Sequence, residues 1–256
     1  MNPITRFLSE LQEVSLLLWR SLVSLFSRPR YYSETIKQMD LIGVGSLPIV
    51  LLTGFFTGGV LVLQVFPTLQ YYSIQNEAGN SVATSLIREL GPVLTALMVS
   101  GRIGAAISAE LGSMVVSQQI DAMRALGTDP VRRLVVPRII SLIFMLPLLT
   151  VAADILGLVG GGLIASSIYN QDWHVFATSV RVGISTSDLL SGMVKPLFFG
   201  LIIGAVSCYT GLTTSGGTVG VGRSTTDAVV IGSIWVIIFD FFLSKAMQYL
   251  LDLGQL

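Results

Sequence analysis

The sequence predicts an all-α integral membrane protein with five membrane spans, and three observations lead to that fold class. The chain has 256 residues, of which 52% are apolar and only 12% are charged. Its mean hydropathy is +0.76. Apolar runs recur that are long enough to cross a bilayer, which takes about 20 residues. One soluble core could not bury so much apolar surface, so we expect a bilayer to be the solvent.

Residues 1–28 predict a retained amphipathic helix rather than a signal peptide, because the apolar residues are spaced and no small-residue cleavage site follows. The residues on the apolar side are Ile4, Phe7, Leu8, Leu11, Val14, Leu18, Leu22 and Leu25. Such a pattern is typical of a helix lying in the membrane surface, although a helix packed on protein has the same periodicity. Pro29 ends this helix.

The five spans follow in order along the chain. We expect them at about 41–66, 82–116, 134–169, 189–212 and 228–251. The second is too long for a perpendicular crossing and must tilt or project. The third is interrupted by Pro147 and by "GLVGGG". The segments between spans are expected to be loops, including "NQDWHVFATSVRVGISTSD" and the glycine-rich "TTSGGTVGVGRSTTD".

The positive charges predict the orientation, since Lys and Arg accumulate in cytoplasmic segments. With a cytoplasmic amino terminus, the opposite side keeps little beyond Arg181. The cytoplasmic set is then Arg6, Arg20, Arg28, Arg30, Lys37, Arg124, Arg132, Arg133, Arg138 and Arg223. The carboxyl terminus is therefore expected outside.

Residues 117–130, "SQQIDAMRALGTDP", form an unusually polar segment between two apolar spans. Ile120, Met123 and Leu126 share a helical stripe, and Gly127 suits the position after a helix end. The segment is therefore predicted to be a short capped helix. It could be a solvated connector or a docking element for a cytoplasmic partner, and periodicity leaves both readings open.

The usual chemistry of enzymes and metal sites is missing from the sequence. There is one cysteine, Cys208, and one histidine, His174, and no HExxH, GxSxG or Walker A pattern occurs. The run "GGTVGVGR" has no preceding strand and no P-loop lysine. The formal net charge is zero, which gives no signal for binding nucleic acid. We predict no catalytic residue, metal or cofactor in this chain.

Ionisable residues within the spans are the best internal evidence of function, because charges in a bilayer are costly. Arg88 and Glu89 lie near the outer end of the second span, and Lys195 lies in the fourth, with Asp188 at its mouth. These residues could line a substrate pathway or form structural ion pairs between spans. Asp240 and Arg102 are more ambiguous.

Small residues and span number bear on assembly. Three G-x-x-x-G pairs let helices approach closely in lipid, most simply within one chain. They are Gly54 and Gly58, Gly157 and Gly161, and Gly200 and Gly204. Five spans are few for an enclosed passage of lipid size, so a two-fold dimer is the economical solution.

Three stretches resemble one family. Residues 89–140, from "ELGPVLTALMVSGRIG" to "VRRLVVPRII", residues 214–240, and "SLPIVLLTGFFTGGVLVLQ" are similar to MlaE/YrbE-type permeases, the membrane subunits of lipid-moving ABC transporters. The resemblance implies that 117–130 is the coupling helix that docks on the ATPase. The residues implied in docking are Gln118, Gln119, Asp121, Ala122, Arg124 and Gly127. A second cytoplasmic contact is implied at Gly220, Gly222 and Arg223. The family pattern commonly has Glu where this chain has Gln118, which puts one salt bridge to the ATPase in doubt.

The resemblance also implies partners and cargo. It implies a homodimer with a central outward-open cavity lined by Arg88, Glu89 and Lys195, where a cation could hold a phosphate headgroup. The implied partners are a cytoplasmic ABC ATPase dimer that carries ATP and Mg, a periplasmic MCE-domain protein and, in some systems, a STAS-domain protein. The expected activity is phospholipid movement between the bacterial inner membrane and the MCE tunnel, for outer-membrane lipid homeostasis. The absence of a transit peptide favours a bacterial inner membrane over a plastid.

Two alternatives come from other classes. An ion-coupled secondary transporter could use Glu89, Lys195 and Asp240 as a relay, although an odd span number fits poorly with inverted repeats. A structural membrane anchor would need neither the charges within the spans nor the capped helix.

Overall fold

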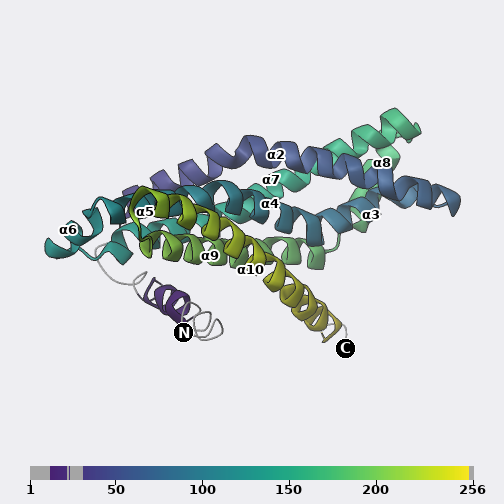
Figure 1. Cartoon of the computed structure of the whole chain (residues 1–256). Helices are drawn as coiled ribbons and strands as arrows, with labels where there is room; N and C mark the ends of the chain where they lie inside the picture. Colours follow the sequence, from purple (N-terminus) through teal and green to yellow (C-terminus); the bar gives the residue numbers. More distant parts are fainter. Residues whose placement is uncertain (1–11, 22, 24–30, 254–256) are drawn as a thin grey trace, which may run out of the picture. The chain divides into compact units, whose positions relative to one another are not determined.

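The computed structural model describes residues 12–21, 23 and 31–253, and the regular structure in these ranges is helical (Figure 1). Residues 12–21 form a short helix. Most of the predicted apolar side of the amino-terminal helix, from Ile4 to Leu11 with Leu22 and Leu25, lies outside the described residues. The later elements are α2 (Tyr32–Tyr71), η1 (Gln75–Glu77), α3 (Ala78–Ser85), η2 (Leu86–Leu90), α4 (Gly91–Val99), η3 (Ser100–Gly104), α5 (Ala105–Val116), α6 (Gln119–Ala125), η4 (Val131–Val135), α7 (Val136–Tyr169), α8 (Trp173–Gly183), α9 (Thr186–Leu212) and α10 (Gly217–Leu253).

Five helical runs in the described ranges are long and apolar enough to cross a membrane, which confirms the predicted number. They are Tyr32–Tyr71, Gln75–Val116, Val131–Tyr169, Thr186–Leu212 and Gly217–Tyr249. Each extends beyond the predicted span, because polar residues at the ends continue the helix. The third is not interrupted: α7 runs through Pro147 and the glycine cluster.

Two segments expected to be loops are helical. Residues 173–183 form α8, so His174 lies on a helix whose first turn is capped by Asp172, which accepts a hydrogen bond from the His174 N–H at 2.7 Å. In the glycine-rich segment, Gly216 and Gly217 adopt positive φ, and α10 begins at Gly217. Gly220 and Gly222 therefore lie within a helix and not in a turn.

The chain divides into two compact units. The first comprises residues 1–44, 99–145 and 199–236, and the second comprises 45–98, 146–198 and 237–256. In the first unit, fully buried apolar side chains from α5, α7 and α9 form the core. They include Ile107, Leu111, Ile139, Leu142 and Ile203.

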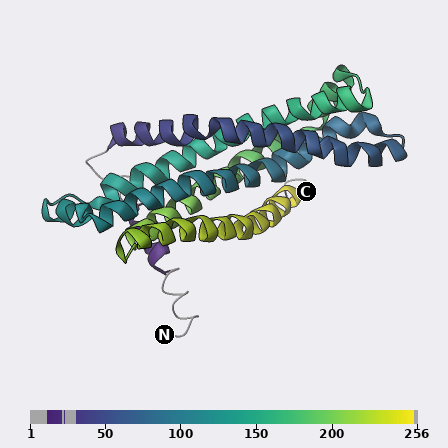
Figure 2. The ribbon, with the colours of Figure 1, turned by 45° about the horizontal axis from the view of Figure 1, so that its top comes forward.

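Helix-helix contacts in the second unit rely on glycine. A Cβ on Gly58 of α2 would collide with the carbonyl oxygen of Gly157 of α7, and a Cβ on Gly54 would collide with that of Ala153. The two G-x-x-x-G motifs therefore join α2 and α7 within one chain, as expected. These helices lie side by side in Figure 2. On α3 and α8, Ser179 accepts from the Asn80 N–H at 2.9 Å beside a core that includes Val82 and Phe176.

Three short π-helical turns, η2, η3 and η4, occur in the second and third spans. A π turn carries one extra residue, which changes the direction of the side chains that follow, and such turns are frequent at functional sites. Arg88 and Glu89 both lie in η2.

Candidate functional site

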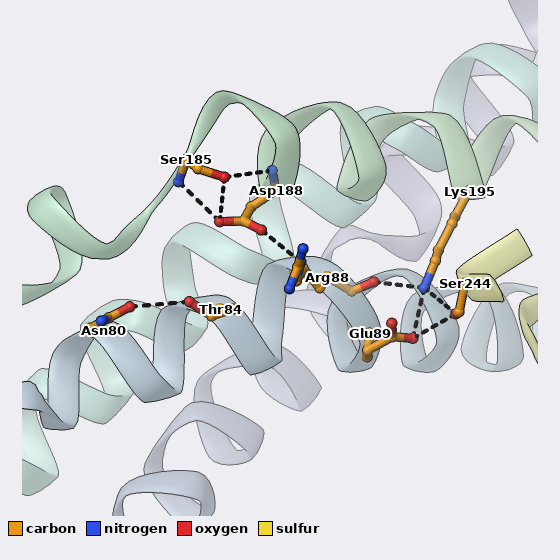
Figure 3. Close-up of polar contacts among 8 residues, drawn as sticks. All are labelled: Asn80, Thr84, Arg88, Glu89, Ser185, Asp188, Lys195 and Ser244. Carbon is orange, nitrogen blue, oxygen red and sulfur yellow. Dashed lines mark hydrogen bonds and ion pairs between the residues drawn. The ribbon is translucent and has the colours of Figure 1, made fainter. Parts of the chain in front are cut away.

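The candidate site lies in the second unit, where η2 packs against α9 and α10 (Figure 3). The structure brings together all four predicted pathway residues, Arg88, Glu89, Asp188 and Lys195, in two neighbouring ion pairs. Asp240 of α10 joins one of these pairs.

Lys195 is the centre of the first pair. Its Nζ lies 2.6 Å from Glu89 Oε2 and 3.2 Å from Asp240 Oδ1. It also donates to the Arg88 carbonyl and to Ser244 Oγ, each at 2.8 Å. The side chain is 0% exposed, so water cannot replace these partners. An ammonium group has three N–H donors. Four acceptors already surround this one, which leaves no donor for a ligand.

Glu89 is bound more loosely than its partner. Its side chain is 49% exposed, and Oε2 also accepts from Ser244 Oγ at 3.1 Å. Lys195 and Ser244 thus fix one carboxylate oxygen, while the side chain stays accessible at the surface of the unit. Glu89 is positioned by the buried Lys195 and by Ser244, but it is not enclosed by them.

Arg88 and Asp188 form the second pair. Arg88 Nε lies 2.6 Å from Asp188 Oδ1, with the Arg side chain 43% exposed and the Asp side chain buried. Among the described residues, the guanidinium is paired through Nε alone. Its two terminal nitrogens can therefore donate to oxygens of a phosphate or a carboxylate.

Asp188 is held by the start of α9. The Ser185 N–H and Oγ each lie 2.9 Å from Asp188 Oδ2, and the Asp188 N–H donates to Ser185 Oγ at 3.2 Å. This reciprocal arrangement is a capping box, with Ser185 before the first helical residue and Asp188 in the first turn. One carboxylate therefore both caps α9 and orients Arg88.

Further polar residues continue along the same helical run. Asn80, Thr84 and Arg88 are spaced four residues apart, and Thr84 Oγ1 donates to Asn80 Oδ1 at 3.2 Å (Figure 3). Sequence reasoning missed Asn80, Thr84, Ser185 and Ser244. The four-residue spacing and the S-x-x-D pattern at 185–188 are signals that could have found three of them.

The predicted docking segment lies in the first unit. Helix α6 begins after Gln118, whose backbone is left-handed at φ 58°, and ends before Gly127 at φ 73°. Gln118, Gln119, Asp121, Ala122, Arg124 and Gly127 are exposed. Asp121 and Arg124 pair with each other at 3.2 Å. Ile120 is buried as expected, but Leu126 is 82% exposed, because the helix ends before it.

The second predicted contact region is also in the first unit. Gly222 and Arg223 are exposed in the early turns of α10. A Cβ on Gly220 would collide with the Ser215 carbonyl oxygen, so that glycine permits the sharp entry into the helix. Ser224, next to Arg223, is tied to the core by Thr214 and Ser108.

No group of three or more His, Cys, Asp or Glu side chains gathers as a metal site within the described ranges. Arg138, predicted among the cytoplasmic charges, is buried and lies 2.7 Å from Glu110 Oε2. That pair joins α7 to α5.

The helices define a multi-pass membrane protein with ion pairs between its spans. Residues 35–246 match the family model described as Permease MlaE, and the chain belongs to that family. A probable ABC transporter permease protein of Rickettsia prowazekii is 41% identical over 90% of this chain and 89% of its own length. One from Synechocystis is 43% identical over 84% and 81%. Protein TRIGALACTOSYLDIACYLGLYCEROL 1, chloroplastic, of Arabidopsis thaliana is 37% identical over 84% of this chain and 61% of its own length. The chain is thus an ABC transporter permease subunit, a non-catalytic membrane component that works with an ATPase.

Proposed function

We propose that this permease moves phospholipid between a bacterial inner membrane and a periplasmic MCE-protein tunnel, as a homodimer driven by a cytoplasmic ABC ATPase dimer. Membership of the MlaE family supports the transport role, and the name of the Arabidopsis relative points toward a glycerolipid. The observation that carries the headgroup assignment is Arg88, which Asp188 holds through Nε while its terminal nitrogens stay available.

In this proposal the two ion pairs have different roles. Arg88 binds the phosphate of the headgroup, and Glu89 lies beside it to contact an amine or hydroxyl group. Lys195 and Asp188 act as positioning residues, because each is buried and already bonded to its partners. The apolar side chains of the spans take the acyl tails.

The headgroup role can be tested by lipid mass spectrometry. The full chain is purified in mild detergent as wild type, Arg88→Gln and Arg181→Gln, the last being an exposed arginine of α8. Arg88→Gln should lower the phospholipid recovered per chain, and Arg181→Gln should not. Equal recovery from Arg88→Gln and wild type would remove Arg88 from the pathway.

We further propose that α6 docks on the ATPase, with the amino terminus of the chain cytoplasmic and the carboxyl terminus periplasmic. The helix presents exposed charges, and the residue after it, Leu126, presents an exposed apolar side chain that could enter an apolar groove of the partner. Gly222 and Arg223 supply the second contact. An MCE protein binds on the opposite side, with a STAS-domain protein as a further cytoplasmic partner.

Exchanging the two charges of α6 tests the docking role. Asp121→Arg with Arg124→Asp keeps the ion pair within the helix and the net charge, but reverses the pattern shown to a partner. The matched control exchanges Glu34 and Lys37, another exposed pair three residues apart. The ATPase should be lost only from the α6 variant during affinity purification. Retention in both variants would contradict docking through these charges.

An ion-coupled secondary transporter is the second candidate, because Glu89, Lys195 and Asp240 lie in one cluster. It is distinguished by transport in liposomes that hold the isolated chain and no ATPase.

A further inference from the structure

A small cavity in the second unit lies between α2, α4 and α7, and one acidic side chain lines it. Its walls are Val50, Thr53, Gly54, Thr57, Leu86, Gly91, Leu94, Thr95, Met98, Ala153 and Asp154. The volume is about 10 Å³, which is room for one water molecule. The cavity is thus polar on one side and too small for a lipid headgroup.

Asp154 is the only titratable residue in this lining. The residue is 7% exposed, and within the described ranges no hydrogen-bond donor reaches its Oδ1. By contrast, each carboxylate of the candidate site in the same unit has a cation. Glu89 and Asp240 contact Lys195, and Asp188 contacts Arg88. An ionised Asp154 would be a buried charge with no counter-ion among residues 12–21, 23 and 31–253, which is the least favourable state for a carboxylate in a membrane.

The approach of Asp154 to α4 depends on a glycine. A Cβ on Gly91, the residue directly after η2, would collide with Asp154 Oδ1. The carboxyl group therefore lies against bare backbone at the point where the π turn ends. Gly91 and Asp154 both line the cavity, so this contact places the carboxyl at the cavity wall.

The remaining polar groups of the cavity are neutral hydroxyls. Thr53 Oγ1 donates its one hydrogen to the Ile49 carbonyl at 2.7 Å, so toward any other partner this oxygen can only accept. Hydroxyls both donate and accept, and a protonated carboxyl has the same two capacities, whereas a carboxylate only accepts. The chemistry of the lining therefore matches the acid form, with one water molecule able to bridge it to the threonines.

We propose that Asp154 is a proton-binding site within the membrane-spanning part of the permease. The carboxyl is held as the acid by Thr53, Thr57, Thr95 and a single water, and it exchanges its proton when α4 moves away from α7. A sodium ion would have to displace the water and leave the carboxylate charged. The site is separate from the proposed headgroup contact and does not depend on the cargo.

Infrared spectroscopy of the full chain in lipid nanodiscs at pH 7 tests this site. The protonated carboxyl C=O absorption, identified by its shift in D₂O, should be present in the wild type and absent from Asp154→Asn. Asp240→Asn is the matched control and should keep the band, because Asp240 is paired with Lys195. A wild type without the band, or Asp154→Asn with an unchanged band, would overturn the proposal.

Two further measurements cover the case in which Asp154→Asn fails to fold and the case in which the site binds a cation other than a proton. Thr95→Val keeps the carboxyl and the side-chain shape, and should shift the band without removing it. An unshifted band would overturn the assignment of this cavity as the environment of the proton. Replacing choline chloride by sodium chloride should leave the band unchanged. Loss of the band in sodium would show that the site takes sodium in place of a proton.

Discussion

Lys195 donates both to the Glu89 carboxylate and to the Arg88 carbonyl, so one buried ammonium group fixes a side chain and the backbone of the same π turn. The turn η2 therefore depends on α9 for its shape as well as for its charge balance. The Arg88 side chain in turn contacts α9 through its ion pair with Asp188. The two exposed side chains of the site are thus oriented by two buried residues of one helix.

Lys195→Met should destabilise the protein, because it leaves the Glu89 and Asp240 carboxylates without their cation. Loss of one partner of a fully buried pair costs about 3–5 kcal/mol in unfolding free energy, and the exposure of Glu89 places the expected loss at the lower end of that range. Denaturant unfolding of the full chain in mixed micelles measures the change. Lys37→Met is the control, since its exposed pair with Glu34 contributes about 0–1 kcal/mol.

Adding Glu89→Gln to Lys195→Met completes a double-mutant cycle. The double variant should lose less than the sum of the single variants, because one of the unpaired charges is removed with its partner. Additive losses would show that the two side chains are not coupled.

Ser185→Ala should weaken the start of α9 and release Asp188. Removing a capping serine costs about 0.5–2 kcal/mol. The Asp188 carboxylate would lose the Ser185 Oγ donor and the Asp188 N–H would lose its acceptor, while the backbone N–H of residue 185 stays in place. The melting temperature measures the loss of stability. Ser187→Ala, a serine in the same first turn two residues after Ser185, should change the melting temperature little. If the two variants melt alike, the capping box does not stabilise the helix.

Gly58→Ala should disrupt the α2–α7 contact, since the new methyl group would collide with the Gly157 carbonyl oxygen. Overpacking of this kind costs about 1–3 kcal/mol. Gly101→Ala meets no atom within 4 Å and serves as the control. It should be neutral or stabilising, and an equal loss from both would contradict a specific glycine contact.

Gln118→Gly should stabilise the entry into α6. A residue with a side chain in the left-handed region is disfavoured by about 1–2 kcal/mol, and glycine is not. The melting temperature of the variant should therefore rise. If the Gln118 side chain also contacts the ATPase, the same variant should lose affinity for it, so stability and co-purification would move in opposite directions.

The number and order of the spans could be predicted because bilayer-length apolar runs are a strong signal. The ends of the helices could not be predicted, since residues 173–183 and 217–227 are polar enough to resemble loops. They are held in helices by a cap at Asp172 and by a left-handed start at Gly217. Such local features outweigh composition.

The candidate site was predictable as a set of residues but not as an arrangement. The cost of charge in a bilayer drew attention to Arg88, Glu89 and Lys195. It could not show that Lys195 is enclosed while Glu89 is exposed, because that depends on Ser244 and Asp240 arriving from α10. The same criterion should have identified Asp154, a single acid in an apolar span, which sequence reasoning passed over.

The glycine contacts between α2 and α7 also limit how the second unit can deform. Where backbone meets backbone there are no side-chain rotamers to readjust, and small shifts of one helix cannot be absorbed at the interface. Any displacement of this part of α7 therefore carries α2 with it. Helices α2 and α7 therefore move together as one rigid body here, and α4 is the wall of the Asp154 cavity that can move separately from them.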